Sequence, residues 1–124
     1  MLGEKNAIAT VAVKDIGVAK KFYEGVLGLE PQPTKEPSVA EYRSGNAEVM
    51  VYESKYAGTS QATAVTWFVD HLEKLVQTLK SKGVVFEHYD MPGVTLQGDV
   101  HLAGRLKNAW FKDPDGNILA LVSQ

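Results

Sequence analysis

Histidines are the side chains of this sequence best suited to acid–base or metal chemistry near neutral pH, and the chain has three of them. Because it has no cysteine, any metal site must be built from His, Asp and Glu. His88 and His101 bracket a long segment, and together with Asp90 they could form a metal-ligand or acid/base cluster. Alternatively, both histidines hydrogen-bond the backbone of that segment, as most polar loop residues do. We interpret His71, at the start of an expected helix, as a solvated or capping residue.

The composition is that of one compact globular domain, with 124 residues of which 44% are hydrophobic and 23% are charged. A net charge of −2 gives no electrostatic reason to expect nucleic acid or an anionic membrane as a partner. The apolar runs are far shorter than the roughly 20 residues that cross a bilayer, and residues 1–6 lack a signal-peptide pattern. We therefore expect a cytoplasmic protein. The sequence contains no nucleophile elbow, phosphate-binding glycine loop or dinucleotide fingerprint.

The C-terminal stretch predicts a β-hairpin. A proline–aspartate–glycine turn at 113–117 separates two apolar runs, Ala109 to Lys112 and Asn117 to Val122. We expect these runs to pair as antiparallel strands with Trp110 opposite Ala120. Alternation along the strands then aims both side chains to the same face of the sheet.

A strand, a helix and three further strands follow one another twice along the chain. In the first half Asp15 is the expected helix N-cap and Gly28 the stop, whereas in the second half Asp70 and Glu73 give a capping-box signal before a helix that ends at Gly83. The pattern predicts an α+β fold in which one domain, residues 1–124, holds two tandem βαβββ modules that curve around a shared cleft. The expected ranges are about 7–53 for module 1, 54–61 for a linker and about 62–124 for module 2, with a long loop at 89–104 that could act as a lid.

One segment resembles the last hairpin of the glyoxalase/bleomycin-resistance/dioxygenase proteins, the vicinal oxygen chelate superfamily. It is Phe111-Lys112-Asp113-Pro114-Asp115-Gly116-Asn117. The resemblance extends to the paired modules and so spans nearly the whole chain. In members that use a metal, each of four strands supplies one ligand. The resemblance equates those four positions with apolar residues, namely Ile8, Met50, Ala64 and Ala120.

These four side chains offer none of the donors that a divalent ion needs, so the resemblance implies a member without the usual metal and without a cofactor. Glu48, two residues from Met50 and on the same strand face, is the nearest carboxylate. The strand faces around these positions mix aromatic rings, small residues and hydroxyls, which is typical of a ligand pocket. Alternatively, the aromatic rings fill a closed core or a dimer interface.

A planar aromatic ligand could stack on Trp110, beside the small Ala120, and this hypothesis defines the candidate site. The candidate ligand-binding residues are Thr10, Met50, Tyr52, Thr66, Phe68, His88, Met91, His101, Trp110 and Ala120.

Three functions stay open at this point. The first is a metal-independent protein that binds a small aromatic or apolar molecule, for example by sequestering an antibiotic. The second is a glyoxalase-like lyase or dioxygenase with a metal held by a non-standard set, Glu48, His88 and His101. The third is a structural or biosynthetic accessory domain without catalysis. The resemblance also implies a symmetric homodimer.

Overall fold

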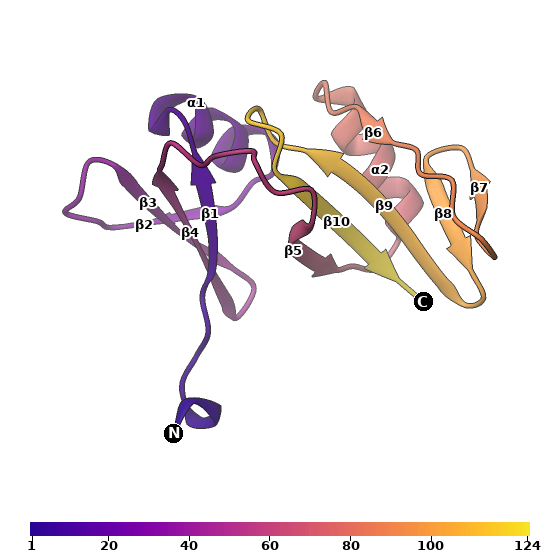
Figure 1. Ribbon diagram of the computed structural model, residues 1–124, viewed down its shortest axis with the longest axis horizontal. Helices are drawn as coiled ribbons and strands as arrows, with labels where there is room; N and C mark the ends of the chain where they lie inside the picture. The colour runs from indigo at the N-terminus through magenta and orange to yellow at the C-terminus, as the bar shows by residue number, and fades with distance from the viewer. The chain divides into compact units, whose positions relative to one another are not determined.

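The computed structural model describes all residues from 1 to 124, and the chain divides into two compact units. Unit 1 comprises Met1–Ser60 together with Pro114–Asn117, and unit 2 comprises Gln61–Asp113 together with Ile118–Gln124. Unit 1 combines a mixed sheet with a short 3₁₀ helix (Leu2–Glu4) and a longer helical segment, and unit 2 combines a mixed sheet with one helix (Figure 1). The expected α+β fold with two βαβββ modules is confirmed.

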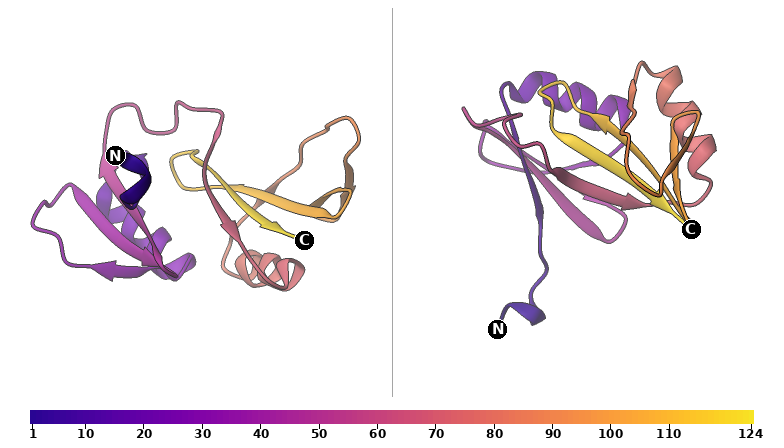
Figure 2. Two further views of the ribbon diagram at one scale, coloured as in Figure 1. Left: turned by 90° about the horizontal axis from the view of Figure 1, so that it is seen from below. Right: turned by 45° about the vertical axis from the view of Figure 1, so that its right-hand side comes forward.

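Unit 1 contains a four-stranded sheet with helix α1 on one face (Figures 1 and 2). The strand order is β1-β4-β3-β2, and only the β1–β4 pair is parallel. Alternation along β1 and β4 buries Val11, Val13, Val49 and Val51 beneath the helix. The bounds are β1 (Ala9–Val13), β2 (Glu30–Gln32), β3 (Val39–Ser44) and β4 (Ala47–Glu53).

The first helix begins and ends where the sequence predicts. The Asp15 carboxylate caps it by accepting a hydrogen bond from the Val18 backbone N–H at 3.0 Å. Helix α1 (Ile16–Lys20) continues without a break into a π-helical segment (Lys21–Val26), and Gly28 ends it in the left-handed conformation, with φ of 73°.

Two tyrosines join this helix to the sheet. The rings of Tyr23 and Tyr42 stack with their centroids 6.3 Å apart, and both residues are fully buried. The Tyr42 hydroxyl donates to Glu24 Oε2 at 2.8 Å. Burial, followed by the hydrogen bond to the Glu24 carboxylate, raises the pKa of Tyr42, so this tyrosine stays a neutral donor.

The turn between the last two strands belongs to unit 1. Asp115 Oδ2 accepts a hydrogen bond from the Lys14 backbone N–H at 3.0 Å, and Asn117 Nδ2 donates to the Ala12 carbonyl at 2.7 Å. Gly58 lies against the same turn, where an added Cβ would stand 1.9 Å from the Asp115 carbonyl oxygen. The proline–aspartate–glycine turn therefore completes unit 1 as well as closing the hairpin.

Unit 2 contains a six-stranded sheet of order β5-β10-β9-β8-β7, in which β6 also pairs with β9. The predicted register of the last hairpin is confirmed, because Trp110 lies opposite Ala120. Helix α2 (Leu72–Ser81) packs on one face through Leu72, Val76 and Leu79. The strands are β5 (Thr63–Phe68), β6 (Phe86–Glu87), β7 (Thr95–Gln97), β8 (Val100–Ala103), β9 (Leu106–Lys112) and β10 (Ile118–Ser123).

The capping box that we expected at Asp70 and Glu73 is wrong. The N-cap of α2 is His71, whose backbone is left-handed with φ of 53° and whose side chain makes no capping hydrogen bond. Asp70 therefore stands one residue too early for its carboxylate to cap the first turn. Glu73 instead accepts a hydrogen bond from Lys107 Nζ at 2.6 Å, and this bond lowers the pKa of Glu73.

The long segment that we expected as a loop contains the β7–β8 hairpin, which extends the sheet of unit 2 beyond β9 (Figure 2). Its turn is Gly98–Asp99, with Gly98 at φ of 63°. A Gly–Asp pair between two short runs is a hairpin signal that we did not use. Only the part between β6 and β7, residues 88–94, lacks regular structure.

Candidate ligand-binding site

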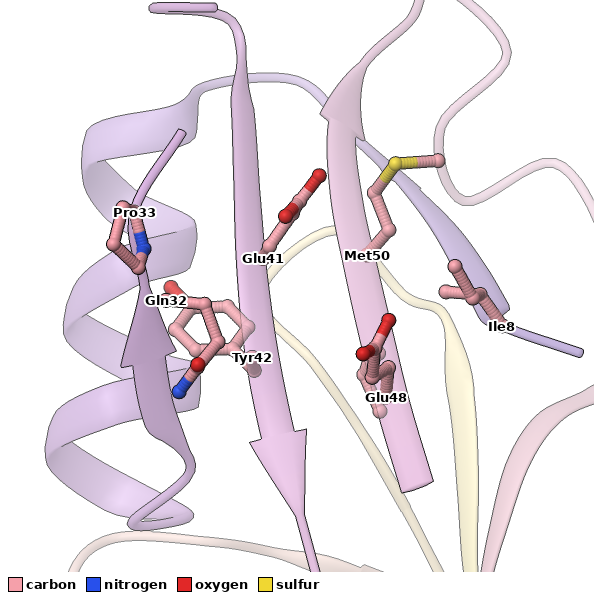
Figure 3. A pocket seen from close by; sticks show the side chains of 8 residues that line it. Ile8, Gln32, Pro33, Glu41, Tyr42, Glu48 and Met50 are labelled. Atoms are coloured by element: carbon pink, nitrogen blue, oxygen red, sulfur yellow. The ribbon is translucent and has the colours of Figure 1, made fainter. Parts of the chain in front are cut away.

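Unit 1 has a pocket on the sheet face that the helix leaves open (Figure 3). Figure 3 shows Glu41, Glu48 and Met50 standing on the same face of β3 and β4. The volume of this pocket is about 330 Å³, which is within the range of small-molecule sites. The lining residues are Ile8, Gln32, Pro33, Glu41, Tyr42, Glu48, Val49 and Met50.

Strand pairing places the side chains of this pocket. Met50 lies opposite Glu41 on β3 and opposite Thr10 on β1, so these three residues form one row across the sheet. Glu48 precedes Met50 by two residues and therefore shares its face. Ile8, just before β1, and Pro33, just after β2, add apolar surface on the two sides (Figure 3).

The charged side chains that line the pocket are acidic. Glu41 and Glu48 contribute two carboxylates, and no basic residue lines the pocket. Arg43 lies opposite Glu48 on β3 and forms an ion pair with Glu30 at 2.6 Å. A pocket with apolar walls and two carboxylates attracts a molecule that combines an apolar body with a positive charge.

Two positions singled out from the sequence lie at this pocket. Ile8 and Met50, two of the four positions at which metal-using relatives would carry ligands, both line it. Glu41 was missed, although the register of the β3–β4 hairpin sets it opposite Met50. Thr10 and Tyr52 lie on the same sheet face outside the lining, and the Thr10 hydroxyl donates to the Ile8 carbonyl at 3.2 Å.

Unit 2 gathers a second group of the candidate residues on the sheet face opposite α2. Ala120 on β10 lies between Thr66 on β5 and Trp110 on β9. Ala120 is 3% exposed, so its methyl group is already covered, whereas Phe68 on the same face is 80% exposed. Trp110 is half-buried.

His101 is fully buried against aromatic rings. Its ring centroid lies 4.9 Å from that of Trp110 and 6.0 Å from that of Tyr89. Nε2 accepts a hydrogen bond from the Tyr89 backbone N–H at 2.9 Å. For His101, the alternative that it hydrogen-bonds the backbone of the long segment is therefore correct.

The expected cluster of His88, Asp90 and His101 does not form. His88 Nε2 instead lies 2.8 Å from Asp99 Oδ1, and Lys80 Nζ lies 2.7 Å from Asp99 Oδ2. The hydrogen bond from Lys80, and then the one from His88, lower the pKa of Asp99. This exposed pairing joins the end of α2 to the β7–β8 turn.

The remaining candidate, Met91, is half-buried between β6 and β7, where its carbonyl accepts a hydrogen bond from the Val94 N–H at 3.2 Å. No group of three or more His, Asp or Glu side chains anywhere in residues 1–124 is arranged to hold a metal ion. No helix is long and apolar enough to span a lipid bilayer.

Comparison with solved structures finds the same fold in proteins of low sequence identity. An integron cassette protein from the mobile metagenome of the Halifax Harbour sewage outfall is 19% identical, with a TM-score of 0.72 over 98% of this chain and 99% of that one. A genomically encoded fosfomycin resistance protein from Listeria monocytogenes is 12% identical, with a TM-score of 0.72 over 95% and 91%. A lactoylglutathione lyase from Agrobacterium tumefaciens is 13% identical, with a TM-score of 0.69 over 94% and 90%.

A search of curated proteins found no match. The family model of the Glyoxalase/Bleomycin resistance protein/Dioxygenase superfamily, however, matches residues 6–121, which run from before β1 into the last strand, β10. The resemblance first seen in the proline–aspartate–glycine turn thus holds along the chain, and this protein belongs to the glyoxalase/bleomycin resistance protein/dioxygenase superfamily.

Proposed function

We propose that this protein binds a small molecule in the unit 1 pocket without a metal ion. The observation that carries the proposal is a pocket of about 330 Å³ lined by Ile8 and Met50, at two positions where the family resemblance would put metal ligands. Neither side chain can coordinate a divalent ion. The walls they form suit an apolar or aromatic body.

The ligand class follows from the two carboxylates. Glu41 and Glu48 stand beside the apolar walls, and Arg43, which lies opposite Glu48 on β3, is paired with Glu30. A positively charged group on an aromatic or apolar body satisfies both parts of the lining. A sequestering, resistance-type role accords with this chemistry, because apolar walls and two carboxylates are enough to hold such a molecule.

The candidate residues of unit 2 remain part of the proposal as a second binding surface, with Thr66, Phe68 and Trp110 on one sheet face. The symmetric homodimer also stays a prediction. Among the solved structures compared above, one is described as a fosfomycin resistance protein and one as a lactoylglutathione lyase. Binding of a small molecule is the role for which we argue, from the apolar walls and the two carboxylates of the unit 1 pocket.

A thermal-shift screen tests the proposed ligand class. We expect aromatic amines to raise the melting temperature more than neutral analogues of the same shape, because only the bound state is stabilised. Met50→Lys, which puts a cation into the pocket, should weaken binding by at least tenfold, or about 1.4 kcal/mol. Glu41→Gln combined with Glu48→Gln should remove the preference for amines.

Glu36→Gln is the matched control, since Glu36 is an exposed carboxylate that does not line the pocket, and it should bind like the wild type. Two results count against the proposal: a screen in which no compound shifts the melting temperature, and binding that survives Met50→Lys unchanged.

Metal removal tests the second part of the proposal. Dialysis against EDTA should leave the melting temperature and the amine affinity unchanged, because the pocket supplies only two carboxylates as donors. Elemental analysis of the purified protein measures the metal content directly. About one transition-metal ion per chain, lost after His88→Ala or His101→Ala, would establish the alternative of a metal-dependent enzyme.

A further inference from the structure

Two polar atoms in unit 2 are buried without any hydrogen-bond partner in the protein. They are Nδ1 of His101 and the hydroxyl of Tyr89. Folded proteins pair nearly all buried polar atoms, so an unpaired one calls for an explanation. These two belong to a single aromatic cluster with Trp110, whose ring centroid lies 5.4 Å from that of Tyr89.

The hydrogen bond to the backbone fixes the tautomer of His101. Because Nε2 accepts from the Tyr89 N–H, it must carry a lone pair, so the proton of the neutral ring is on Nδ1. Nδ1–H is thus a donor without an acceptor. The cluster offers hydrogen-bond capacity that the protein itself does not use.

Tyr89 contacts the His101 ring without pairing with this donor. It lies on the irregular segment 88–94, and both its ring and its backbone N–H contact His101. The segment has few other anchors, namely the His88–Asp99 contact on the surface and the turn from Met91 to Val94. Displacing Tyr89 would expose the face of Trp110, which is already half open to solvent.

We propose that the cluster of Tyr89, His101 and Trp110 is a ligand site that Tyr89 closes. A planar molecule with a carbonyl oxygen on its rim takes the place of the Tyr89 ring beside Trp110 and accepts a hydrogen bond from His101 Nδ1–H. The proposal deepens the second binding surface of the proposed function, and it rests on that function only in taking the protein to bind small molecules. It does not depend on the unit 1 pocket.

Benzamide and toluene are suitable probes, because the two rings have similar shape and only benzamide carries a carbonyl acceptor. Titrations are followed by NMR through the His101 ring nitrogens and the Trp110 indole N–H, with Trp67→Phe identifying the Trp110 signal. The free protein should show His101 protonated at Nδ1. Benzamide should shift both signals, and toluene should leave the Nδ1–H signal in place.

Three substitutions distinguish the role of the Tyr89 ring from that of the His101 Nδ1–H donor. Tyr89→Ala removes the cover and should tighten benzamide binding at least fivefold. Tyr89→Phe keeps the ring and removes the unpaired hydroxyl, so the melting temperature should stay the same or rise. His101→Phe should abolish the preference for benzamide over toluene, and if that variant does not fold, the Nδ1–H shift in Tyr89→Ala gives the same information.

The proposal is overturned if benzamide leaves both signals of Tyr89→Ala unmoved, if Tyr89→Ala binds no tighter than wild type, or if Tyr89→Phe lowers the melting temperature by several degrees. Met50→Lys should not change the benzamide titration. If amines still bind in a Met50-dependent way while benzamide fails, this inference alone falls. If benzamide binds as expected while amines fail, the unit 1 proposal alone falls.

Discussion

Gly58→Ala is expected to lower the free energy of unfolding by about 2–5 kcal/mol, a large part of the roughly 5–15 kcal/mol that holds a typical domain together. Two effects combine at this position. Gly58 has φ of 70°, where a residue with a Cβ costs roughly 1–2 kcal/mol. The Cβ would also stand 1.9 Å from the Asp115 carbonyl oxygen, and moving a backbone group to make room costs about 1–3 kcal/mol more. The midpoint of urea unfolding measures the loss.

Gly28→Ala is the matched control. Gly28 has nearly the same backbone conformation, with φ of 73°, but an added Cβ there has no neighbour within 4 Å. This variant should lose only the conformational part, about 1–2 kcal/mol. Equal losses of unfolding free energy in the two variants would mean that the Asp115 carbonyl does not lie close to Gly58 in solution.

Phe111→Ala is expected to cost about 3–5 kcal/mol, the usual range for deleting a buried phenylalanine ring. Phe111 is fully buried at the centre of unit 2, where its ring meets that of Phe86 edge to face at 5.5 Å. Its cross-strand partner, Leu119, is also fully buried. The surrounding strands cannot collapse into the space, so both transfer energy and contacts are lost. Urea unfolding again provides the measurement.

Phe68→Ala removes the same ring from the other side of the same sheet and serves as the comparison. Phe68 is 80% exposed, so truncating it should change stability by no more than about 0.5 kcal/mol. A loss as large as that of Phe111→Ala would contradict this expectation. It would show that Phe68 is covered in solution, for example by a second subunit.

Local chemistry made much of the fold predictable. The Asp15 cap, the Gly28 stop and the Trp110–Ala120 register all depend on neighbours close in sequence or on one tight turn. The start of α2 was not predictable in the same way, because few residues other than glycine adopt the left-handed conformation, and nothing in the sequence around His71 indicates it there.

The site was harder to predict than the strands. Alternation gave the face of Met50, but the pocket also needs Glu41, whose place depends on strand pairing across the sheet. The burial of His101 depends on a segment with no periodic pattern folding over it. Nothing in the types or spacing of His88 and His101 distinguishes the exposed ring from the buried one.

The turn Pro114–Asn117, which belongs to unit 1, affects how this unit folds during synthesis on the ribosome. Lys14 and Ala12 find their hydrogen-bond partners 101 and 105 residues later in the chain. Residues 1–60 therefore leave the ribosome well before the turn Pro114–Asn117, and until that turn has been made the Lys14 N–H and the Ala12 carbonyl lack these two partners. Contacts of such long range slow folding, because the loop must close before they contribute. The four strands of unit 1 can pair before then, but the unit gains its full set of hydrogen bonds only after Pro114–Asn117 has been made.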